Sequence, residues 1–485
     1  MFQSKLASTF LLTSLMTTLI WAQTDKQKIH TLKNNGTLIY NTQKSADSVH
    51  DMFTQGDFYG RLRSNNFYFA YELPDSSHYT QAVGSLGASF VFKSAHFKGF
   101  DTTLGLYSSQ SFFVNQKDPI GSLKASKDTL SRYNYVNTGS KSMAVLAQAN
   151  IAYTYSQTKF TLGRQLVETF YTKSNDTKMI PNTFDGFVLD SKDIANTRIK
   201  FAYLQKQKLR DHTDAHAVLM YDDRDTANYS QWSQNDDGAM HRGLTYSKLK
   251  QFNKPTDAPL IVLDTQNSSV KNLKLNFSSY LVPELLSQVM GEANYKMAFN
   301  GFSITPGIRY IQQFDNGAGK VGGPSLYNIG EAGYKDANSL NAAMLGARVV
   351  ARIKDYRLNL AYTGVFDKAD LVTPWRGFPT AGYTRSMGMY NWRANVKSYR
   401  IELVKGANSS GIYTSPFIQT SVLYMDGDAH KAETDSLFYY AGLIQNLPSA
   451  PEFQYRLRLG WRHFTSSNTL ISDYLDSRFE LNYLF

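Results

Sequence analysis

The sequence contains no cysteine among its 485 residues. A chain without cysteine has no disulfide framework, no catalytic thiol and no thiolate ligand for a metal ion. Long hydrophobic runs are also missing: after Ala22 no stretch approaches the roughly 18 apolar residues of a transmembrane helix, and the mean hydropathy is −0.38. These absences exclude a disulfide-stapled fold and a bundle of membrane-spanning helices.

A polar average does not exclude a transmembrane β-barrel, because each barrel strand needs only one apolar face. Aromatic residues are plentiful, with 32 tyrosines and 30 phenylalanines against 5 tryptophans. Such a composition suits the aromatic girdles of a membrane barrel, although ordinary core packing also uses aromatic residues. A closed barrel is therefore the remaining way for this chain to span a membrane.

The N-terminus has the pattern of a secretory signal peptide. Lys5 precedes an apolar run over residues 6–21, and the small residue Ala22 comes directly before polar sequence. We expect residues 1–22 to be removed after export. A retained membrane anchor is the alternative, but the run holds several serines and threonines and is shorter than the roughly 20 residues of a spanning helix. Residues 23–54 are predicted to form a periplasmic segment that either plugs a pore or lies outside it.

The C-terminal segment alternates like a half-buried strand. Phe479, Leu481, Tyr483 and Phe485 share one parity, and the residues between them are polar or charged. In a strand these two sets face opposite sides, as they also do in a soluble β-sandwich. An aromatic residue at the chain end resembles the signal by which outer-membrane barrels are recognised. We therefore expect the barrel-assembly machinery to bind Phe485.

Similar segments recur along residues 55–485. They predict an all-β fold, a transmembrane antiparallel β-barrel of about 18 strands, which is an even number as in single-chain bacterial barrels. The predicted strands are residues 56–72, 81–93, 97–108, 143–155, 158–167, 195–207, 214–223, 257–266, 270–281, 288–299, 301–313, 341–353, 356–367, 392–404, 411–425, 434–446, 453–465 and 475–485.

The lengths of the predicted connections alternate. Even-numbered connections, such as residues 354–355, are short, and this arrangement is typical of outer-membrane barrels with short periplasmic turns and long extracellular loops. A soluble β protein has no reason to sort its loops in this way. The longest connections are all odd-numbered: residues 109–142, 168–194, 224–256, 314–340 and 368–391.

The formal net charge of +11 falls to about +10 if Lys5 leaves with the signal peptide. A basic chain could bind nucleic acid, but these cations are dispersed along alternating strands. We expect no nucleic-acid partner. An anion-attracting lumen, or contacts with outer-membrane lipid and anionic lipopolysaccharide, fits the pattern better.

Strand parity predicts a basic wall inside the barrel. Near the C-terminus Leu457 and Leu459 alternate with arginines, and residues 345–354 and 196–204 repeat the pattern. Because the apolar sets must face lipid, the cations opposite them point inward. Any single cation could merely pair with an inward acid, whereas a row of cations favours anions or the carboxylate of a zwitterion. The predicted wall comprises Arg61, Arg63, Arg198, Lys200, Arg309, Arg348, Arg352, Arg393, Arg456, Arg458 and Arg462.

A second candidate region is the loop at residues 168–194, ETFYTKSNDTKMIPNTFDGFVLDSKDI. Its PNTFDG run is also compatible with a simple turn. The order LGRQ, ND, KMIPNTFDG and a following strand resembles the constriction-loop region of the OprD-type porin family, including its Helicobacter and Campylobacter relatives among outer-membrane proteins. The segment GRLRSNNFYFAYE and the aromatic C-terminus agree with that family.

The resemblance implies an eighteen-stranded monomeric channel, with a trimer as the alternative, whose third extracellular loop folds inward opposite wall arginines. It also implies small carboxylate-bearing substrates, including amino acids and peptides. Lys178 replaces an arginine of the family pattern, and Phe170-Tyr171 replaces a proline-containing step, so substrate preference does not carry over. The constriction-loop candidates are Asp176, Lys178, Asn182, Asp185, Asp190 and Asp193.

These features predict a porin in the outer membrane of a Gram-negative bacterium, which lets small hydrophilic solutes diffuse passively and selectively without a cofactor or metal. A barrel enzyme such as a phospholipase would need a serine nucleophile and a histidine base. No histidine lies in such a motif, and His212 and His216 flank a predicted turn. We therefore expect no enzymatic activity.

The alternative function is an adhesin or structural barrel that acts through its extracellular loops. One candidate loop contains Trp232, Asp236 and Asp237, and another contains Trp375 and Arg376. Aromatic and charged side chains of this kind commonly dominate protein interfaces. Sequence alone does not separate adhesion from diffusion.

Overall fold

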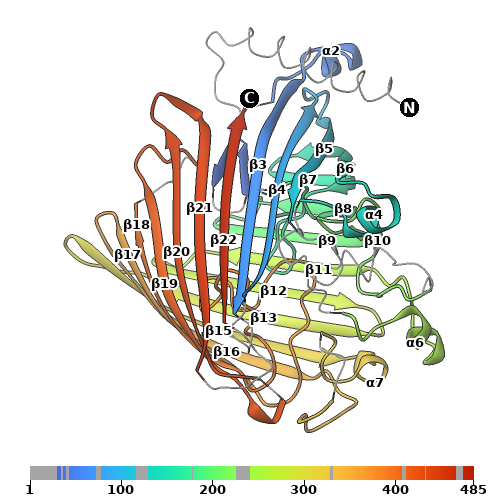
Figure 1. Ribbon diagram of the computed structural model, residues 1–485. Coiled ribbons are helices and arrows are strands. Elements are labelled where there is room, and N and C mark those ends of the chain that lie inside the picture. Colours follow the sequence, from blue (N-terminus) through green and yellow to red (C-terminus); the bar gives the residue numbers. More distant parts are fainter. Residues whose placement is uncertain are drawn as a thin grey trace.

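The computed structural model of the protein is a closed antiparallel β-barrel (Figure 1). Eighteen strands form its wall, as the alternating segments predict. The barrel closes where the last strand pairs with the first, from Tyr474 opposite Tyr71 to Leu484 opposite Arg61. The structure describes residues 30–33, 36–39, 43–72, 78–115, 129–176, 178–224, 241–327, 331–406, 411–431, 433–465 and 473–485.

The wall strands are β3 (Asp57–Glu72), β4 (His78–Lys93), β5 (Phe100–Val114), β6 (Ser142–Tyr155), β7 (Thr158–Gln165), β8 (Thr183–Ser191), β9 (Thr197–Lys208), β11 (Leu260–Asn267), β12 (Leu273–Val282), β13 (Leu286–Tyr295), β15 (Phe302–Asp315), β16 (Ala342–Ile353), β17 (Tyr356–Val365), β18 (Lys397–Lys405), β19 (Phe417–Asp426), β20 (Ser436–Leu447), β21 (Ala450–Phe464) and β22 (Tyr474–Leu484). Two-residue strands, β10 (His216–Ala217) and β14 (Met297–Ala298), pair with β9 and β15.

The other elements of the described residues are short. A hairpin of β1 (His30–Lys33) and β2 (Gly36–Ile39) precedes the barrel, and the helices are α2 (Val49–Thr54), α4 (Arg132–Thr138), α6 (Tyr246–Gln251), α7 (Ala318–Gly322) and the 3-10 helix η2 (Ala429–Lys431). Among the described residues, no helix has the length and apolar character needed to cross a membrane.

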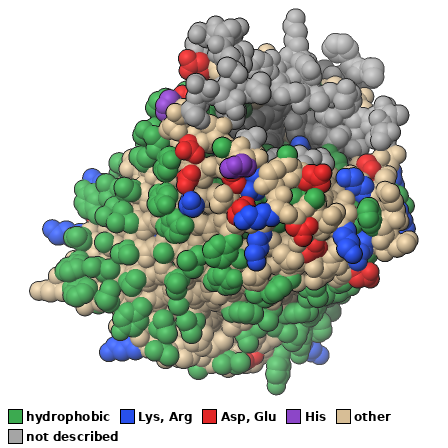
Figure 2. All heavy atoms as spheres, turned by 90° about the horizontal axis from the view of Figure 1, so that it is seen from below, with side chains coloured by type: hydrophobic (Ala, Val, Ile, Leu, Met, Phe, Trp, Pro, Cys, Tyr) green, Lys and Arg blue, Asp and Glu red, His purple; other side chains and the backbone are tan. Residues whose placement is uncertain are grey.

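The strands alternate between an apolar outer face and a polar inner face. In β18, Tyr399, Ile401 and Leu403 are exposed, while Arg400 and Glu402 between them are buried. The predicted parity of β21 is confirmed, because Leu457 and Leu459 are exposed and Arg458 is buried. Figure 2 shows hydrophobic side chains spread over the outer surface, which is the face that a membrane barrel presents to lipid.

Turns and loops occupy opposite ends of the barrel. Connections of two residues join β6 to β7, β16 to β17 and β20 to β21. Ser156 and Lys354 in such turns adopt φ values of 52° and 48°, the left-handed conformation that tight hairpins require. Residues 209–259, 316–341 and 366–396 form long connections at the other end, where Figure 1 shows α6 and α7. The predicted loop asymmetry is therefore confirmed.

Two predictions of individual strands were wrong. One strand was missed and one was predicted in excess, so the number of strands is unaffected. Residues 183–191 were expected in a loop but form β8, and residues 214–223 were expected as a strand but form only β10. Acidic and turn-forming residues hide the alternation of β8. The apolar residues Val218, Leu219 and Met220 are consecutive and all buried, since they pack in a core formed by loops and the inner wall. The strand β9 consequently runs in the opposite direction to the one predicted.

Candidate channel constriction

Two long loops fold into the barrel and join one another. The first, residues 166–182, follows β7, and the second, residues 366–396, follows β17. The amide of Lys173 donates to the Trp375 carbonyl at 3.0 Å, and the amide of Gly377 donates to the Tyr171 carbonyl at 2.9 Å. These antiparallel hydrogen bonds join the two loops, which together are called the loop pair below.

Aromatic packing fixes the loop pair against the wall. Tyr280 of β12 contacts Tyr171 and Trp375 edge to face, with ring centroids 4.8 and 4.9 Å apart. The Tyr280 hydroxyl donates to the Val372 carbonyl at 2.7 Å, and the Trp375 indole donates to the Val218 carbonyl at 2.8 Å. Because these rings are almost fully buried, the loop pair is part of the packed interior.

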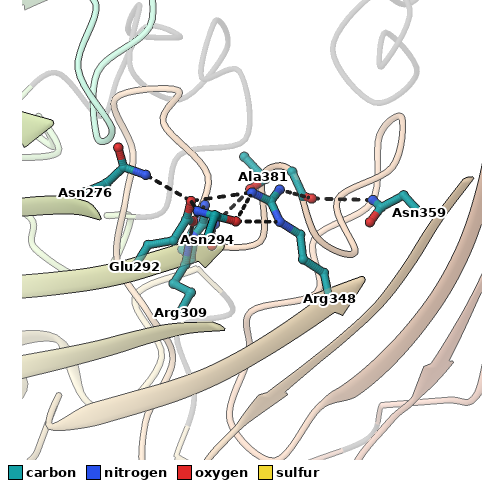
Figure 3. Close-up of polar contacts among 9 residues, drawn as sticks. Asn276, Glu292, Asn294, Arg309, Arg348, Asn359 and Ala381 are labelled. Carbon is teal, nitrogen blue, oxygen red and sulfur yellow. Dashed lines mark hydrogen bonds and ion pairs between the residues drawn. The ribbon is translucent and has the colours of Figure 1, made fainter. Parts of the chain in front are cut away.

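The first cluster of charges anchors the second loop (Figure 3). Arg309 of β15 bonds Glu292 of β13 through Nε at 2.7 Å. Its Nη1 also donates to the carbonyls of Pro379 and Ala381 at 2.7 and 2.8 Å. The guanidinium lies over the rings of Phe170 and Tyr383, 4.9 and 4.4 Å from their centroids. Arg309 thus contacts both members of the loop pair.

Arg348 of β16 extends this cluster. Its Nη2 lies 3.5 Å from Glu292 and donates to the side-chain Oδ1 of Asn294 at 2.7 Å, and its Nη1 donates to the Gly382 backbone carbonyl at 2.7 Å. Asn276 donates to Glu292 at 3.1 Å from the neighbouring strand. Figure 3 shows these side chains converging from separate strands on the backbone of the second loop.

The second cluster anchors the first loop. Lys178 Nζ lies 2.9 Å from Glu480 of β22, which also pairs with Arg458 and lies 3.9 Å from Arg456. The carbonyl of Lys178 in turn accepts a hydrogen bond from Arg63.

A wall arginine and an amide complete the attachment of this loop. Arg61 bonds the Asp176 carbonyl, and its Nη2 lies 3.4 Å from the Asp176 carboxylate. Asn182 accepts a hydrogen bond from Gln207 at 3.0 Å and donates to the Lys173 carbonyl at 3.2 Å. Asp176, Lys178 and Asn182 therefore lie in the inward-folded loop, and each contributes to its attachment.

Two further clusters lie along the wall. Asp190 of β8 pairs with Arg198 and Lys200 of β9, with N–O distances of 2.5 and 3.4 Å. Glu402 of β18 pairs with Arg357 at 2.9 Å and with Arg400. Across the four clusters, nine cations form ion pairs with four carboxylates, those of Glu480, Glu292, Glu402 and Asp190.

The wall cations differ in their access to the lumen. The side chains of Arg309 and Arg458 are only 7% and 8% exposed, because they are enclosed by acids, rings or loop backbone. Arg198 and Arg357 are 42% and 33% exposed. Arg352 is also exposed. The accessible cations are therefore the ones that a passing solute can meet.

Several predicted site residues lie elsewhere. Asp185 and Asp190 are on the barrel strand β8, where they pair with Arg164 and Arg198, and Asp193 lies in the short turn after it. Their assignment to the constriction loop was wrong, because that loop ends at Asn182 and β8 follows. The assignment of Arg393 to a wall strand was also wrong, since it precedes β18 and pairs with Glu433 of another loop. Arg462 is on β21 and donates to the Ser436 hydroxyl at 3.1 Å.

The second loop was missed as a pore element. Its residues Trp375 and Arg376 were candidates for an exposed adhesive surface, but both are buried inside the barrel, which contradicts that interpretation. The other adhesive candidates, Trp232, Asp236 and Asp237, lie outside the described residues, as does the predicted signal peptide. The two tryptophans of the second loop were the available signal, but its contacts with residues 171–173 are too distant in sequence to predict.

Comparison with known proteins agrees with this architecture. Residues 125–257 match the model of a family described as outer membrane porin, OprD family. No curated protein sequence matches the chain. Pseudomonas aeruginosa OccK9 (OpdG) has a similar structure, with a TM-score of 0.66, 16% identity, and coverage of 90% of this chain and 99% of OccK9.

Two other solved structures have the same fold. Pseudomonas aeruginosa OpdK with vanillate has a TM-score of 0.62 and 12% identity, covering 88% of this chain and 98% of OpdK. Acinetobacter baumannii OccAB3 has a TM-score of 0.64 and 14% identity, covering 88% of this chain and 99% of OccAB3.

Proposed function

We propose that this chain, an outer-membrane β-barrel porin related to the OprD family, favours small carboxylate-bearing or zwitterionic solutes such as amino acids or short peptides. The observation that carries the proposal is the excess of cations in the four wall clusters, where nine cations share four carboxylates. An unbalanced row of arginine and lysine along a narrow pore favours anionic groups.

Guanidinium groups suit this task because they bind carboxylates in bidentate geometry. Arg198 and Arg357 are already paired with Asp190 and Glu402, and both retain substantial exposure. A solute carboxylate would therefore displace Asp190 or Glu402 from its arginine. It would not bind to a cation that has no partner. Such exchange keeps binding weak enough for release, as conduction requires. The vanillate bound to OpdK is itself a carboxylate, which supports this substrate class by analogy.

The proposed function involves diffusion and no chemistry. The rings of His212 and His216 lie 4.8 Å apart, and His212 and His241 are buried in the packed loop region beside β10. We assign them a structural role. We also propose that the protein works as a monomer, that its Phe485 is bound by the barrel-assembly machinery, and that lipopolysaccharide contacts its outer surface.

Single-channel recording of the refolded mature protein in a planar bilayer tests the proposal. The reversal potential in a salt gradient is measured before and after Arg198 and Arg357 are replaced together by alanine. We expect the anion preference to fall, because two accessible lumenal cations are lost. Lys405→Ala is the matched control, since Lys405 is exposed at the end of β18 with the parity of the outward-facing Tyr399 and Leu403.

Two results would overturn the proposal. An intact barrel without conductance steps would make the adhesin or structural role the better explanation. Conductance with an unchanged reversal potential in the double variant would show that the wall cations do not select the solute. Swelling of proteoliposomes in glutamate, in a diamine that lacks a carboxylate and in a neutral sugar then separates preference for carboxylates from preference for size.

A further inference from the structure

The hairpin of β1 and β2 lies at the mouth where the short turns gather. Within the described part of the chain its strands pair only with each other, from His30 opposite Ile39 to Lys33 opposite Gly36. Leu32 is buried, and its carbonyl accepts a hydrogen bond from Gln454 Nε2 at 3.2 Å. Gln454 is a buried residue near the start of β21, with the parity of the inward-facing arginines. Figure 1 shows the hairpin in dark blue behind β22.

The hairpin is seated on groups that point into this mouth. Tyr413, in the connection between β18 and β19, is buried and exchanges two hydrogen bonds with Asn446, at 2.8 and 2.9 Å. Gln454 donates to the Asn446 side chain at 3.2 Å. Gly411, with φ at 76°, approaches the hairpin so closely that a Cβ there would lie 2.9 Å from the Thr31 Cβ. We call Gly411, Tyr413, Asn446 and Gln454 the hairpin seat.

The segment after the hairpin is held elsewhere on the same rim. The His96 amide donates to the Lys44 carbonyl at 2.7 Å, and the Ala46 amide donates to the His96 carbonyl at 2.6 Å. The Ala95 amide donates to the Met52 carbonyl at 2.9 Å. The turn that contains His96 joins β4 to β5, so β19, β20, β21, β22, β3 and β4 separate it from the connection that contains Gly411. Of the residues that the structure describes, 30–33 and 43–54 therefore lie at separate parts of this mouth.

We infer that the β1–β2 hairpin is an internal plug that narrows the periplasmic mouth and limits solute flow through the channel. This inference rests on the proposed function, because it needs a conducting barrel. An isolated two-stranded hairpin is only marginally stable in water. The hairpin therefore needs its contacts with the hairpin seat to stay folded. If the hairpin left the mouth, the hydrogen bonds of the barrel wall would remain, since the hairpin adds no strand to the wall.

An engineered disulfide can test both the position of the hairpin and its effect on conductance, because the natural chain has no cysteine. Thr31 and Gly411 are replaced by cysteine; their Cβ positions would need to separate by roughly 1 Å to reach disulfide geometry. The unitary conductance of the refolded protein is compared before and after reduction. We expect the bridge to form and its reduction to raise the conductance, since the plug is then free to leave.

A second pair, Leu32→Cys with Gln454→Cys, avoids the left-handed backbone at Gly411. Thr31→Cys with Lys405→Cys is the control for placement, because Lys405 is on the outer face and should not form a bridge. Each single-cysteine variant controls for the oxidant.

The outcomes separate this inference from the proposed function. Failure of both engineered pairs to form a bridge in a folded, conducting barrel would place the hairpin elsewhere and overturn the inference. A bridge with equal conductance in both redox states would also overturn it, because the hairpin would then not obstruct flow. A barrel that shows no conductance in either state would instead contradict the proposed function, while the efficiency of bridge formation would still report the hairpin position.

Discussion

The ammonium of Lys178 lies 2.9 Å from Oε1 of Glu480, so an inward-folded loop is held to the final strand of the barrel. Both side chains are almost completely buried. Glu480 also pairs with Arg458 and lies near Arg456, and three cations from two parts of the chain therefore share this one carboxylate. Loss of this carboxylate affects the loop and the wall together.

Replacing Glu480 by glutamine should destabilise the barrel more than replacing Lys178 by methionine. The first change leaves three buried or half-buried cations without their acid, whereas the second leaves Glu480 with two arginines. Breaking a buried ion pair costs about 3–5 kcal/mol, and we expect Glu480→Gln to fall in this range. Urea unfolding in detergent micelles measures the difference, and equal losses for both variants would contradict the shared-acid arrangement.

Gly377→Ala should separate the loop pair. A Cβ at this position would overlap backbone atoms of Phe170 and Tyr171, which cannot rotate away as a side-chain end could. We expect a larger or more variable unitary conductance, since the hydrogen bonds between the loops are strained or lost. Gly291→Ala is the matched control, because a Cβ at Gly291 has no neighbour within 4 Å. Unchanged conductance in Gly377→Ala would show that loop contact does not set the pore width.

Arg309→Met should release the second loop from the wall. The substitution removes two hydrogen bonds to the Pro379 and Ala381 carbonyls and the cation–π contacts with Phe170 and Tyr383. Trypsin should then cleave within residues 366–396, where Arg376 is buried in the intact protein. Mass spectrometry of the fragments locates the cut. Arg352→Met, which changes an exposed wall arginine, should leave the loop resistant.

The short turn containing Asp193 should be insensitive to mild acid. Hydrogen bonds from Ser156 and Thr158, and from the Gln157 amide, lower the pKa of Asp193 to about 2. Its carboxylate joins two neighbouring turns, at 2.6 Å from the Ser156 hydroxyl and 2.9 Å from the Gln157 amide.

Because the folded-state pKa lies below the unfolded value of about 3.9, the stabilisation is complete above pH 4 and is lost as the pH falls through about 2. Amide hydrogen exchange of residues 156–160, corrected for intrinsic rates, measures the stability of the turn. Asp193→Asn should exchange faster at pH 6, and its difference from the natural chain should disappear near pH 2. A difference that persists at pH 2 would contradict the assignment.

Much of the barrel could be predicted from local pattern. Leu457, Leu459 and Arg458 alternate because lipid and lumen demand opposite chemistry on the two faces of one strand, and that demand is visible in a single segment. The exceptions have physical causes. In β8, Asp185 and Asp190 face arginines of neighbouring strands, so charges that suggested a loop are neutralised across the sheet. The segment with Val218 and Leu219 is apolar because loops cover it.

The candidate site was less predictable than the fold. Parity placed Arg198 and Arg309 on the inner face, but it could not distinguish an accessible cation from one that fastens a loop. Arg309 is enclosed by Phe170 and Tyr383, which come from two loops that are far from Arg309 in the sequence. Such contacts depend on tertiary packing. Only the structure therefore shows which arginines are accessible in the pore and which hold a loop.

The hydrogen bonds between residues 171–173 and 375–377 join the two loops directly, without a wall residue between them. The two loops form one partition across the pore. Other residues form the hydrogen-bonded strands and their apolar outer face. A change at a loop residue that makes no contact with the wall can thus alter the pore width without altering the number of strands or their lipid-facing side chains. Permeability and the membrane-embedded surface therefore depend on different sets of residues.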